Sequence, residues 1–369
     1  MALSKITTAS LADDSVTGAK IENNPTVAGN LTVSGSFAPS TTTSGKNMIM
    51  NGAMRIHQRV ATLTHNDKAV DRFQLTKNNL VTADFTTRHY VAGEAEVREF
   101  GGDSVEIKCT TADTSLASNE VVRLRHPIEA QYVRRLAYGT ANAKTTILSF
   151  WVYTNVTGTY AVNFTAMDGT VRNISKTYTV SQANQWVKYS ITIPGDTSAT
   201  IDNDNGEGFE INWGLAAGSG WTGTNPNGAW ANNTDSRNYY GQTVNIASAV
   251  NNVWYLTGVQ WEEGSVATEF EQETIGETLR KCQRYYQQLM TSGQGYTTGS
   301  QHIGINMRYL VEMRAAATVT LAYDGGDQYN NLTGSPTVHR NRTDGFHAYQ
   351  SANSGNYYYY YIGTSDAEI

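Results

Sequence analysis

Cysteine is scarce in this chain. Its 369 residues include two cysteines, Cys109 and Cys282, which stand far apart and in unrelated patterns. A disulfide framework or a CxxC zinc site needs several cysteines at close spacing, so neither is expected. The seven histidines form no HExxH motif and no HxH pair, which gives metal catalysis little support. We expect two buried thiols and no required cofactor.

Basic charge and long apolar runs are also scarce. The formal net charge is −6 and no run of Lys and Arg exceeds two residues, so the positive field that binds nucleic-acid backbones is missing. The apolar runs fall far short of the roughly 18 to 20 residues that span a bilayer. The N-terminus MALSKITTASLADD lacks the basic and apolar regions of a secretory signal. We expect no nucleic-acid partner, no membrane insertion, and synthesis in a cytoplasm without general export.

Turn-forming and aromatic residues are abundant, with 33 Gly, 22 Tyr and 7 Trp, as is typical of all-β proteins. From residue 47 onward, strand-like segments recur about every 8 to 12 residues between Gly, Asn and Asp turns, which indicates a two-sheet antiparallel sandwich. The segments are VDRFQL, AEVREF, SVEIKCTT, VVRLRH, ILSFWVYT, TYAVNFTAM, ISKTYTV, WVKYSITI, FEINWGL and NNVWYLTGVQW. Only IEAQYVRRLAYG has a helical pattern. The prediction is a jelly-roll sandwich over residues 47–272, closed by the strand VQWEE.

The first 46 residues are rich in Ser, Thr, Gly and Asn, and their apolar residues are thinly spread. So short a segment cannot bury a core, because one or two isolated strands are marginal in water. Two interpretations stay open for residues 1–46. They form a disordered tail, or an extended arm that orders against neighbouring subunits or a larger particle.

A helix is predicted over residues 273–291, after the sandwich. Thr274 and Glu277 have the spacing of a capping box. Apolar residues follow at alternating spacings of four and three, a heptad seam about two heptads long. Its residues are Ile275, Leu279, Cys282, Tyr286 and Leu289. The pattern fits either one core-facing amphipathic helix or a short bundle between chains.

The remaining residues, 292–369, return to strand-like patterns. GINMRYLVEM, AAATVTLAYD and NYYYYYIGT read as strands, with a long Asn-, Gly- and His-rich loop at about 324–348. The five consecutive tyrosines 357–361 would place rings on both faces of one strand. We predict a small C-terminal β domain with one tyrosine face buried and the other exposed.

Several stretches resemble the tail-fibre and receptor-binding virion proteins of tailed bacteriophages that carry a jelly roll like a carbohydrate-binding module. They are NMIMNGAMRIHQR with DRFQL, TTILSFWVYT, QWVKYSITIPGDTSATIDNDNGEGFEINWGLAAGSG, VEMRAAATVTL, and the most specific block, LTGVQWEEGSVATEFEQETIGETLRKCQRYYQQL. ASLADDSVTGAKI and GNLTVSGS are similar to repeats at the start of many phage fibre proteins. The resemblance covers residues 47–323 and the arm.

This resemblance implies a homotrimer located in the virion, with residues 1–46 attached to phage tail or capsid proteins. It also implies a jelly roll that supports or performs glycan binding and a distal tip that meets a bacterial surface polysaccharide. The arm is far shorter than in long fibres, so a tail fibre, a baseplate-proximal adhesin and a capsid fibre all stay open.

The segment DNDNGEGFE gathers carboxylates, which hard cations bind. Its spacing is not that of an EF-hand, because Gly206 stands where a third Asp or Asn ligand is required. Asp202, Asp204 and Glu207 are therefore either calcium ligands or parts of a turn. Glu262 and Glu263 are likewise either ligands or exposed charges at a strand end.

Sugar binding requires aromatic faces beside amide and carboxylate groups. The segment GWTGTNPNGAWANNTDSRNYY supplies Trp221, Trp230, Tyr239 and Tyr240, either as a glycan site or as a loop folded over its own tryptophans. The C-terminal domain supplies the preferred receptor face. Its predicted residues are His339, Arg340, His347, Tyr349 and Tyr359.

Catalysis is not expected. Acidic residues are few, no GxSxG motif occurs, and the long solenoid repeats of a polysaccharide-cutting β-helix are absent from the sequence. No catalytic residue is assigned. A head fibre or tail connector with a purely structural role is the alternative to an adhesin.

Overall fold

The computed structural model describes residues 45–59, 62–63, 68–93, 95–223, 228–323 and 329–369. The predicted arm therefore lies outside the described residues, apart from Gly45 and Lys46. Both cysteines are free and buried, as predicted. Within the described part of the chain, no helix is long and apolar enough to cross a membrane.

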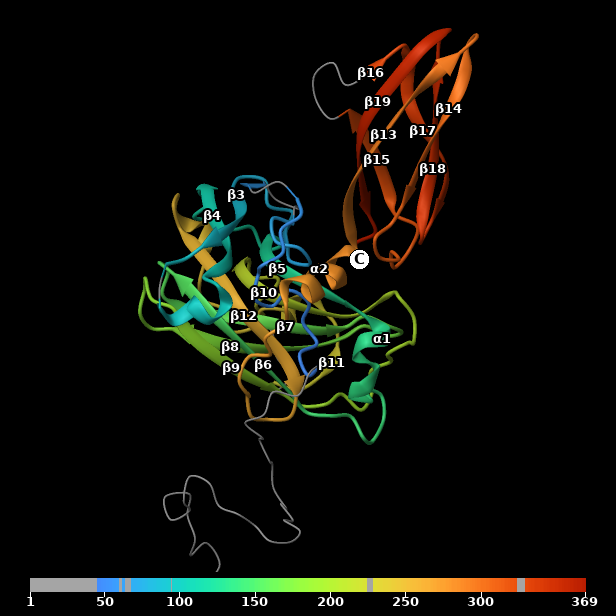
Figure 1. The fold of residues 1–369 in the computed structure, drawn as a ribbon. Helices are drawn as coiled ribbons and strands as arrows, with labels where there is room; N and C mark the ends of the chain where they lie inside the picture. The colour runs from blue at the N-terminus through green and yellow to red at the C-terminus, as the bar shows by residue number, and fades with distance from the viewer. Residues whose placement is uncertain (1–44, 60–61, 64–67, 94, 224–227, 324–328) are drawn as a thin grey trace, which may run out of the picture. The chain divides into compact units, whose positions relative to one another are not determined.

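A sandwich of two six-stranded antiparallel sheets forms the larger region, which confirms the all-β prediction (Figure 1). The first sheet has the order β1 (Thr62–Leu63), β3 (Asp84–Val91), β4 (Asp103–Thr111), β12 (Val253–Glu263), β6 (Thr146–Thr154), β9 (Val187–Ile193). The second has the order β11 (Ala231–Asn232), β8 (Arg172–Val180), β7 (Gly158–Ala166), β10 (Glu207–Ala217), β5 (Val121–Glu129), β2 (Gln74–Asn78). The chain crosses repeatedly from one sheet to the other, as in a jelly roll.

The inner faces of the two sheets bury a core rich in large aromatic side chains. Trp213 on β10 and Trp254 and Trp261 on β12 are fully buried. Trp261 stacks on Phe209 across the sandwich, with ring centroids 4.7 Å apart. Since successive residues of a strand point to opposite faces, this inward set determines which side chains of β12 face outward.

Two short segments depart from the strand pattern. AEVREF was predicted as a strand, but it forms a 3-10 helix, η3 (Ala95–Phe100). Val97 and Phe100 are three residues apart and both buried, which suits the threefold repeat of that helix. The helical pattern of IEAQYVRRLAYG is confirmed only after β5 ends, in α1 (Ala130–Val133) and η4 (Arg134–Leu136). Two further 3-10 turns are η5 (Asp235–Arg237) and η6 (Ile246–Ser248).

The helix after the sandwich is shorter than predicted. The capping box of Thr274 and Glu277 is present, and α2 runs over Ile275–Gln283. Tyr286 and Leu289, assigned to the same heptad seam, lie instead in the strand β13 (Tyr286–Thr297). The strand prevails because β13 pairs along its whole length with β19. Ile275 is 60% exposed, whereas Cys282 is buried.

Two smaller antiparallel sheets form the C-terminal domain, residues 286–369. The first contains β13, β19 (Gly355–Asp366), β15 (Thr318–Tyr323) and β16 (Tyr329–Asn330), and the second contains β14 (Gln301–Arg308), β18 (Gly345–Ala352) and β17 (Leu332–Arg342). The prediction of a loop over residues 324–348 was wrong for β16, β17 and the start of β18, which are strands. Residues 324–328 lie outside the described residues. The polar composition of the segment hid these strands because much of β17 is solvent-exposed.

Buried ion pairs join this domain to the sandwich. Glu129 at the end of β5 is fully buried and accepts hydrogen bonds from Arg284 at 2.8 and 3.0 Å and from the Tyr285 hydroxyl. Arg72, also buried, lies over the Tyr285 ring at 3.5 Å and pairs with Glu368. The segment CQRYY is therefore where the two regions are connected.

Candidate functional site

An aromatic surface lies on the outer face of the first sheet. Tyr90 on β3, Tyr255 on β12 and Tyr153 on β6 project from this face, and Trp186 precedes β9. Their ring centroids are close: Tyr90 and Tyr255 at 5.2 Å, Tyr153 and Tyr255 at 5.4 Å, Tyr153 and Trp186 at 5.7 Å. Together with Ala92 they line a cleft of about 60 Å³. We call these four residues the aromatic face.

Strand register aligns the aromatic face with a charged pair. Arg88 is opposite Glu106, Glu106 is opposite Tyr255, and Tyr255 is opposite Tyr153. Opposed residues of antiparallel strands share a face. One row therefore crosses four strands, from a guanidinium through a carboxylate to two phenol rings.

The charged end of this row is held rigidly. Arg88 donates two hydrogen bonds to Glu106, at 2.6 and 2.9 Å, and the Tyr255 hydroxyl donates to the same carboxylate. The pKa of Arg88 is raised, and the hydrogen bond with Glu106 is the largest cause. Burial and the neighbouring Glu106 raise the pKa of Tyr255. Glu106 therefore has a fixed orientation beside the rings.

This arrangement suits a sugar. A pyranose ring presents C–H groups on its faces, which pack on aromatic rings, and hydroxyls at its edge, which bond to charged side chains. Three half-buried tyrosines supply the rings, and the exposed side of Arg88 supplies donors. The cleft is small, at about 60 Å³, so the rings would contact a sugar without enclosing it.

The loop aromatics predicted as a glycan site do not form one surface. Trp221 is 7% exposed and Tyr239 is fully buried, and the two pack against Val121 and Ala161. Trp230 is half-buried and donates its indole N–H to the Pro194 carbonyl at 2.7 Å. Only Tyr240 is exposed, at 43%. For Trp221 and Tyr239 the loop is folded over its own aromatics.

The residues predicted in the C-terminal domain divide between two faces. His347 and Tyr349 face outward on β18, whereas Tyr359 is buried against the domain core. Tyr349 lies 4.8 Å from the ring of His302 and 6.1 Å from that of His339. His347 and Tyr349 therefore belong to one histidine-rich face, and Tyr359 is structural.

The candidate calcium residues are not gathered as ligands. Within the described ranges, no group of three or more His, Cys, Asp or Glu side chains is placed to hold a metal ion. Asp202 and Asp204 are exposed, and Glu207 turns away to pair with Arg125. Burial, with Glu210 nearby, raises the pKa of Glu207 to about 7, against the effect of Arg125. Glu262 is buried and bonded to Thr268, and Glu263 pairs with Lys144 at 2.7 Å.

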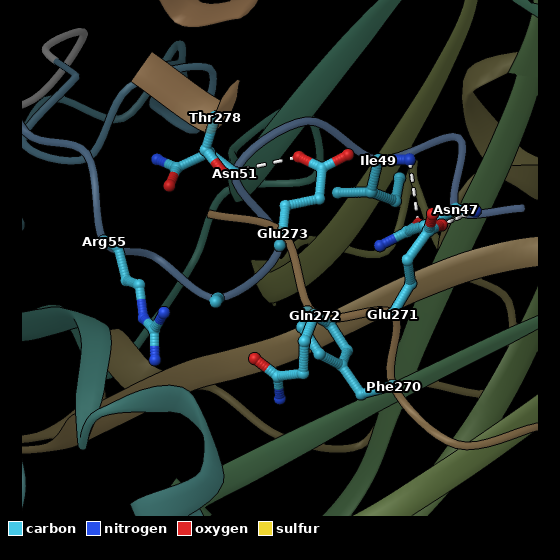
Figure 2. Close-up of a pocket in the computed structure, with 11 residues that line it drawn as sticks. Asn47, Ile49, Asn51, Arg55, Phe270, Glu271, Gln272, Glu273 and Thr278 are labelled. Atoms are coloured by element: carbon cyan, nitrogen blue, oxygen red, sulfur yellow. Dashed lines mark hydrogen bonds between the residues drawn. The ribbon is translucent and has the colours of Figure 1, made fainter. Parts of the chain in front are cut away.

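A second small cavity has a structural role. Figure 2 shows Asn47, Glu271 and Thr278 around it, from segments far apart in sequence. Glu271 accepts a hydrogen bond from the Asn47 backbone N–H at 2.7 Å, and the Asn47 side chain bonds to the backbone of Val259 and Trp261. Its volume of about 20 Å³ holds about one water. The VATEFE segment thus fixes the start of the sandwich.

The aromatic face was missed by sequence reasoning. Tyr153, Trp186 and Tyr255 lie in segments that were recognised as strands, whereas Tyr90 lies in β3, which was not predicted from the sequence. Whether a ring in such a strand faces the core or the solvent depends on register. The signal available was alternation: Tyr255 stands between the inward Trp254 and Leu256, and Tyr153 follows the inward Val152.

No family model and no curated protein sequence matches this chain. Parts of the chain are similar to solved structures. The enzymatically active domain of tailspike protein 4 of bacteriophage CBA120 is 12% identical, with a TM-score of 0.32, over 60% of this chain and 22% of that one. A CBM4 structure is 14% identical, with a TM-score of 0.30, over 58% and 99%.

A family 11 carbohydrate-binding module of a Clostridium thermocellum cellulosomal cellulase is 11% identical, with a TM-score of 0.29, over 57% of this chain and 99% of that one. The chain thus spans about a fifth of the tailspike chain and nearly all of the two modules. At TM-scores this low, the similarities do not indicate what this chain binds. The evidence for the candidate site is the geometry of the aromatic face itself.

Proposed function

We propose that this chain is a carbohydrate-binding virion protein of a tailed phage, a tail fibre or adhesin that binds a host surface glycan on its aromatic face. The row from Arg88 through Glu106 and Tyr255 to Tyr153 carries the proposal. It combines stacking surfaces with fixed polar groups on an outward sheet face. The sequence resemblance to phage receptor-binding proteins supports the virion role and attachment through residues 1–46.

Binding without catalysis is part of the proposal. Glu106, the carboxylate nearest the rings, is held by Arg88 and Tyr255. A general acid or base needs a proton that can be exchanged with the substrate. An ion-paired carboxylate aligned with aromatic rings suits recognition.

Removal of two rings tests the site. We expect Tyr153→Ala with Tyr255→Ala to weaken glycan binding by about tenfold or more, since each aromatic contact contributes about 0.5–1.5 kcal/mol beyond its buried area. Binding is measured on an array of bacterial surface polysaccharides and then by titration with the best ligand. Tyr153→Phe, which keeps the ring, should retain binding.

Tyr240→Ala is the matched control, because it removes an exposed tyrosine from another surface. Equal loss in the control and the double variant would place the glycan elsewhere. Unchanged binding in a folded double variant would remove the aromatic face from the proposal. Thermal melting of each variant shows whether the sandwich is intact.

A structural connector is the rival function. A connector contacts virion proteins at both ends, whereas an adhesin leaves its C-terminal domain free. Electron microscopy of virions labelled with antibody against residues 286–369 separates the two. Labelled fibre tips support the adhesin, and label that appears only after disassembly supports the connector.

Self-association into a homotrimer belongs to the same proposal. Ile275 on α2 is exposed, and the outer face of β13 and β19 exposes Met290, Tyr296, Tyr358 and Tyr360. These apolar groups would be covered by other copies. Light scattering should give a trimer for the native chain and a smaller species for Ile275→Asp. A trimer in both would exclude α2 from the interface.

A further inference from the structure

A cleft in the C-terminal domain is lined by arginine. Its volume is about 310 Å³, and it lies on the outer face of the sheet of β14, β18 and β17. Arg308, Arg340 and Arg342 line it together with Asn306 and His347. We propose that this cleft binds an anionic group, a carboxylate or phosphate, on a bacterial surface polysaccharide.

Strand register builds the cleft. Asn306 is opposite His347, and His347 is opposite Arg340, so these three form one row across the sheet. In the next row, Arg308 and Arg342 are opposite Gly345 on either side. Opposed residues share a face. The three guanidinium groups therefore belong to the same surface.

Gly345 leaves the middle of the second row empty. It has no side chain, so the two flanking arginines have bare backbone between them. Its φ of 154° is a backbone conformation that residues with a side chain rarely adopt. A β-carbon at this position would lie 2.4 Å from the Met307 carbonyl oxygen. The hollow between Arg308 and Arg342 is thus a property of the backbone.

An irregularity in β17 turns the arginines outward. The pairing shifts by one residue between Val338 and Arg340, so that Arg340, and not His339, is opposite His347. Bulges of this kind redirect the side chains that follow. In a regular strand Arg340 and Arg342 would share the face of Val338, which packs against the domain core. The shift places both on the cleft.

The charges favour an anion of limited size. Asp344 at the rim is the only carboxylate among the lining residues, and it lies 3.5 Å from Arg308. Glu312, beyond the hairpin, is held by the Thr343 hydroxyl at 2.7 Å. Among the described residues, Arg340 and Arg342 have no ion-pair partner. Guanidinium groups bind carboxylate and phosphate through paired hydrogen bonds.

A glycan fits better than a nucleic acid. The chain has a net charge of −6, and the arginines occupy one cleft instead of a stripe along the protein. Backbone binding to nucleic acid requires several phosphate contacts in succession. A single charged sugar requires one pocket. This site is independent of the aromatic face.

Titration calorimetry with the full chain tests the cleft. The probes are a trigalacturonate oligosaccharide, its methyl ester, and inorganic phosphate. We expect the acid to bind and the ester to bind about tenfold more weakly or not at all, because the ester has lost the charge. Arg340→Gln with Arg342→Gln should weaken binding of the acid by about tenfold or more.

Arg134→Gln with Arg280→Gln is the matched control, since it removes the same charge from two exposed arginines elsewhere. It should change affinity by less than about twofold. Equal weakening by both pairs would reveal only general electrostatics and overturn the proposal. Failure of trigalacturonate and phosphate alike to bind, or equal binding of acid and ester, would overturn it too.

The phosphate probe distinguishes a carboxylate ligand from a phosphate ligand. Binding of trigalacturonate alone identifies a carboxylate sugar, and binding of phosphate that is lost in Arg340→Gln with Arg342→Gln identifies a phosphorylated one. Single-stranded DNA is added as a further probe. Tighter binding of DNA than of trigalacturonate at physiological ionic strength would overturn the glycan assignment. Loss of neutral-glycan binding in the Tyr153 and Tyr255 variants tests the aromatic face separately.

Discussion

The sandwich and the C-terminal domain are both built from two antiparallel sheets, but they differ in what they bury. The sandwich encloses three fully buried tryptophans. The C-terminal domain contains no tryptophan, and Ile305, Ala348 and Tyr361 are among the residues at the centre of its core. Its sheets have three and four strands, so a larger share of its residues faces outward. The same layered plan therefore yields a stable support in one region and a large exposed surface in the other.

Exposed surface differs in kind as well. The sandwich covers part of its outer face with η3 and the segment around Phe270, which leaves the aromatic face as a limited cleft. The C-terminal domain leaves both outer faces open, one rich in tyrosine and the other rich in arginine and histidine.

The largest expected effect concerns the connection between these regions. Arg284→Met should destabilise the chain by about 3–5 kcal/mol, because it leaves the buried Glu129 carboxylate without its charged partner. Urea unfolding measures the change. Arg280→Met, on the exposed side of α2, should stay within about 0.5 kcal/mol. If Arg284→Met matches this control, the Glu129–Arg284 pair adds no stability.

Acid should weaken the same connection. Burial raises the pKa of Glu129, but hydrogen bonds from Arg284, Tyr285 and Gln131 outweigh burial and lower it below 4.5. A lowered folded-state pKa gives stability that is present above the ordinary value and lost as pH falls through the folded-state value. The stability difference between the native chain and Glu129→Gln should therefore shrink as the pH falls below 4.5. Urea midpoints across this range test it, and a constant difference would contradict it.

A smaller effect is expected at the aromatic face. Tyr255→Phe removes a hydrogen bond to the Glu106 carboxylate and should cost about 1.5 kcal/mol in unfolding free energy. Tyr153→Phe is the comparison, because the Tyr153 hydroxyl has no hydrogen bond to a described residue. Equal melting temperatures for the two variants would mean that the Glu106 contact adds no stability.

The smallest effect should come from the tyrosine-rich outer face of β13 and β19. Tyr296 is 67% exposed, so Tyr296→Ser should change the unfolding free energy of the isolated chain by less than about 0.5 kcal/mol. Thermal unfolding at low and high protein concentration measures this. A large loss that appears only at high concentration would show that other copies cover the face.

Sequence patterns predicted the sandwich well because its strands are long, alternate and bury large side chains. They failed where few side chains of a strand are buried, or where one spacing of apolar residues fits both a helix and a strand. Tyr286 and Leu289 fit the heptad spacing because both are covered, but in β13 they point to opposite faces, Leu289 toward the domain core and Tyr286 under Arg59. The polar residues of β17 resemble a loop. The aromatic face could not be identified from the sequence. Trp221 stands in a Gly- and Ser-rich loop yet is 7% exposed, whereas Tyr255 stands in an apolar strand yet is only half-buried. Which rings stay accessible depends on the loops and strands that cover them.

The pairing of β13 with β19 has a consequence for how such a chain diversifies. Tyr286 is opposite Asp366, so the strand that enters the C-terminal domain and the strand that leaves it meet at the same point. One uninterrupted stretch of gene thus encodes a unit whose two ends coincide in space. Recombination at its borders can exchange the whole unit while the sandwich stays unchanged. The contacts of Glu129, Arg72 and Arg59 at this junction are among those that a replacement would have to preserve.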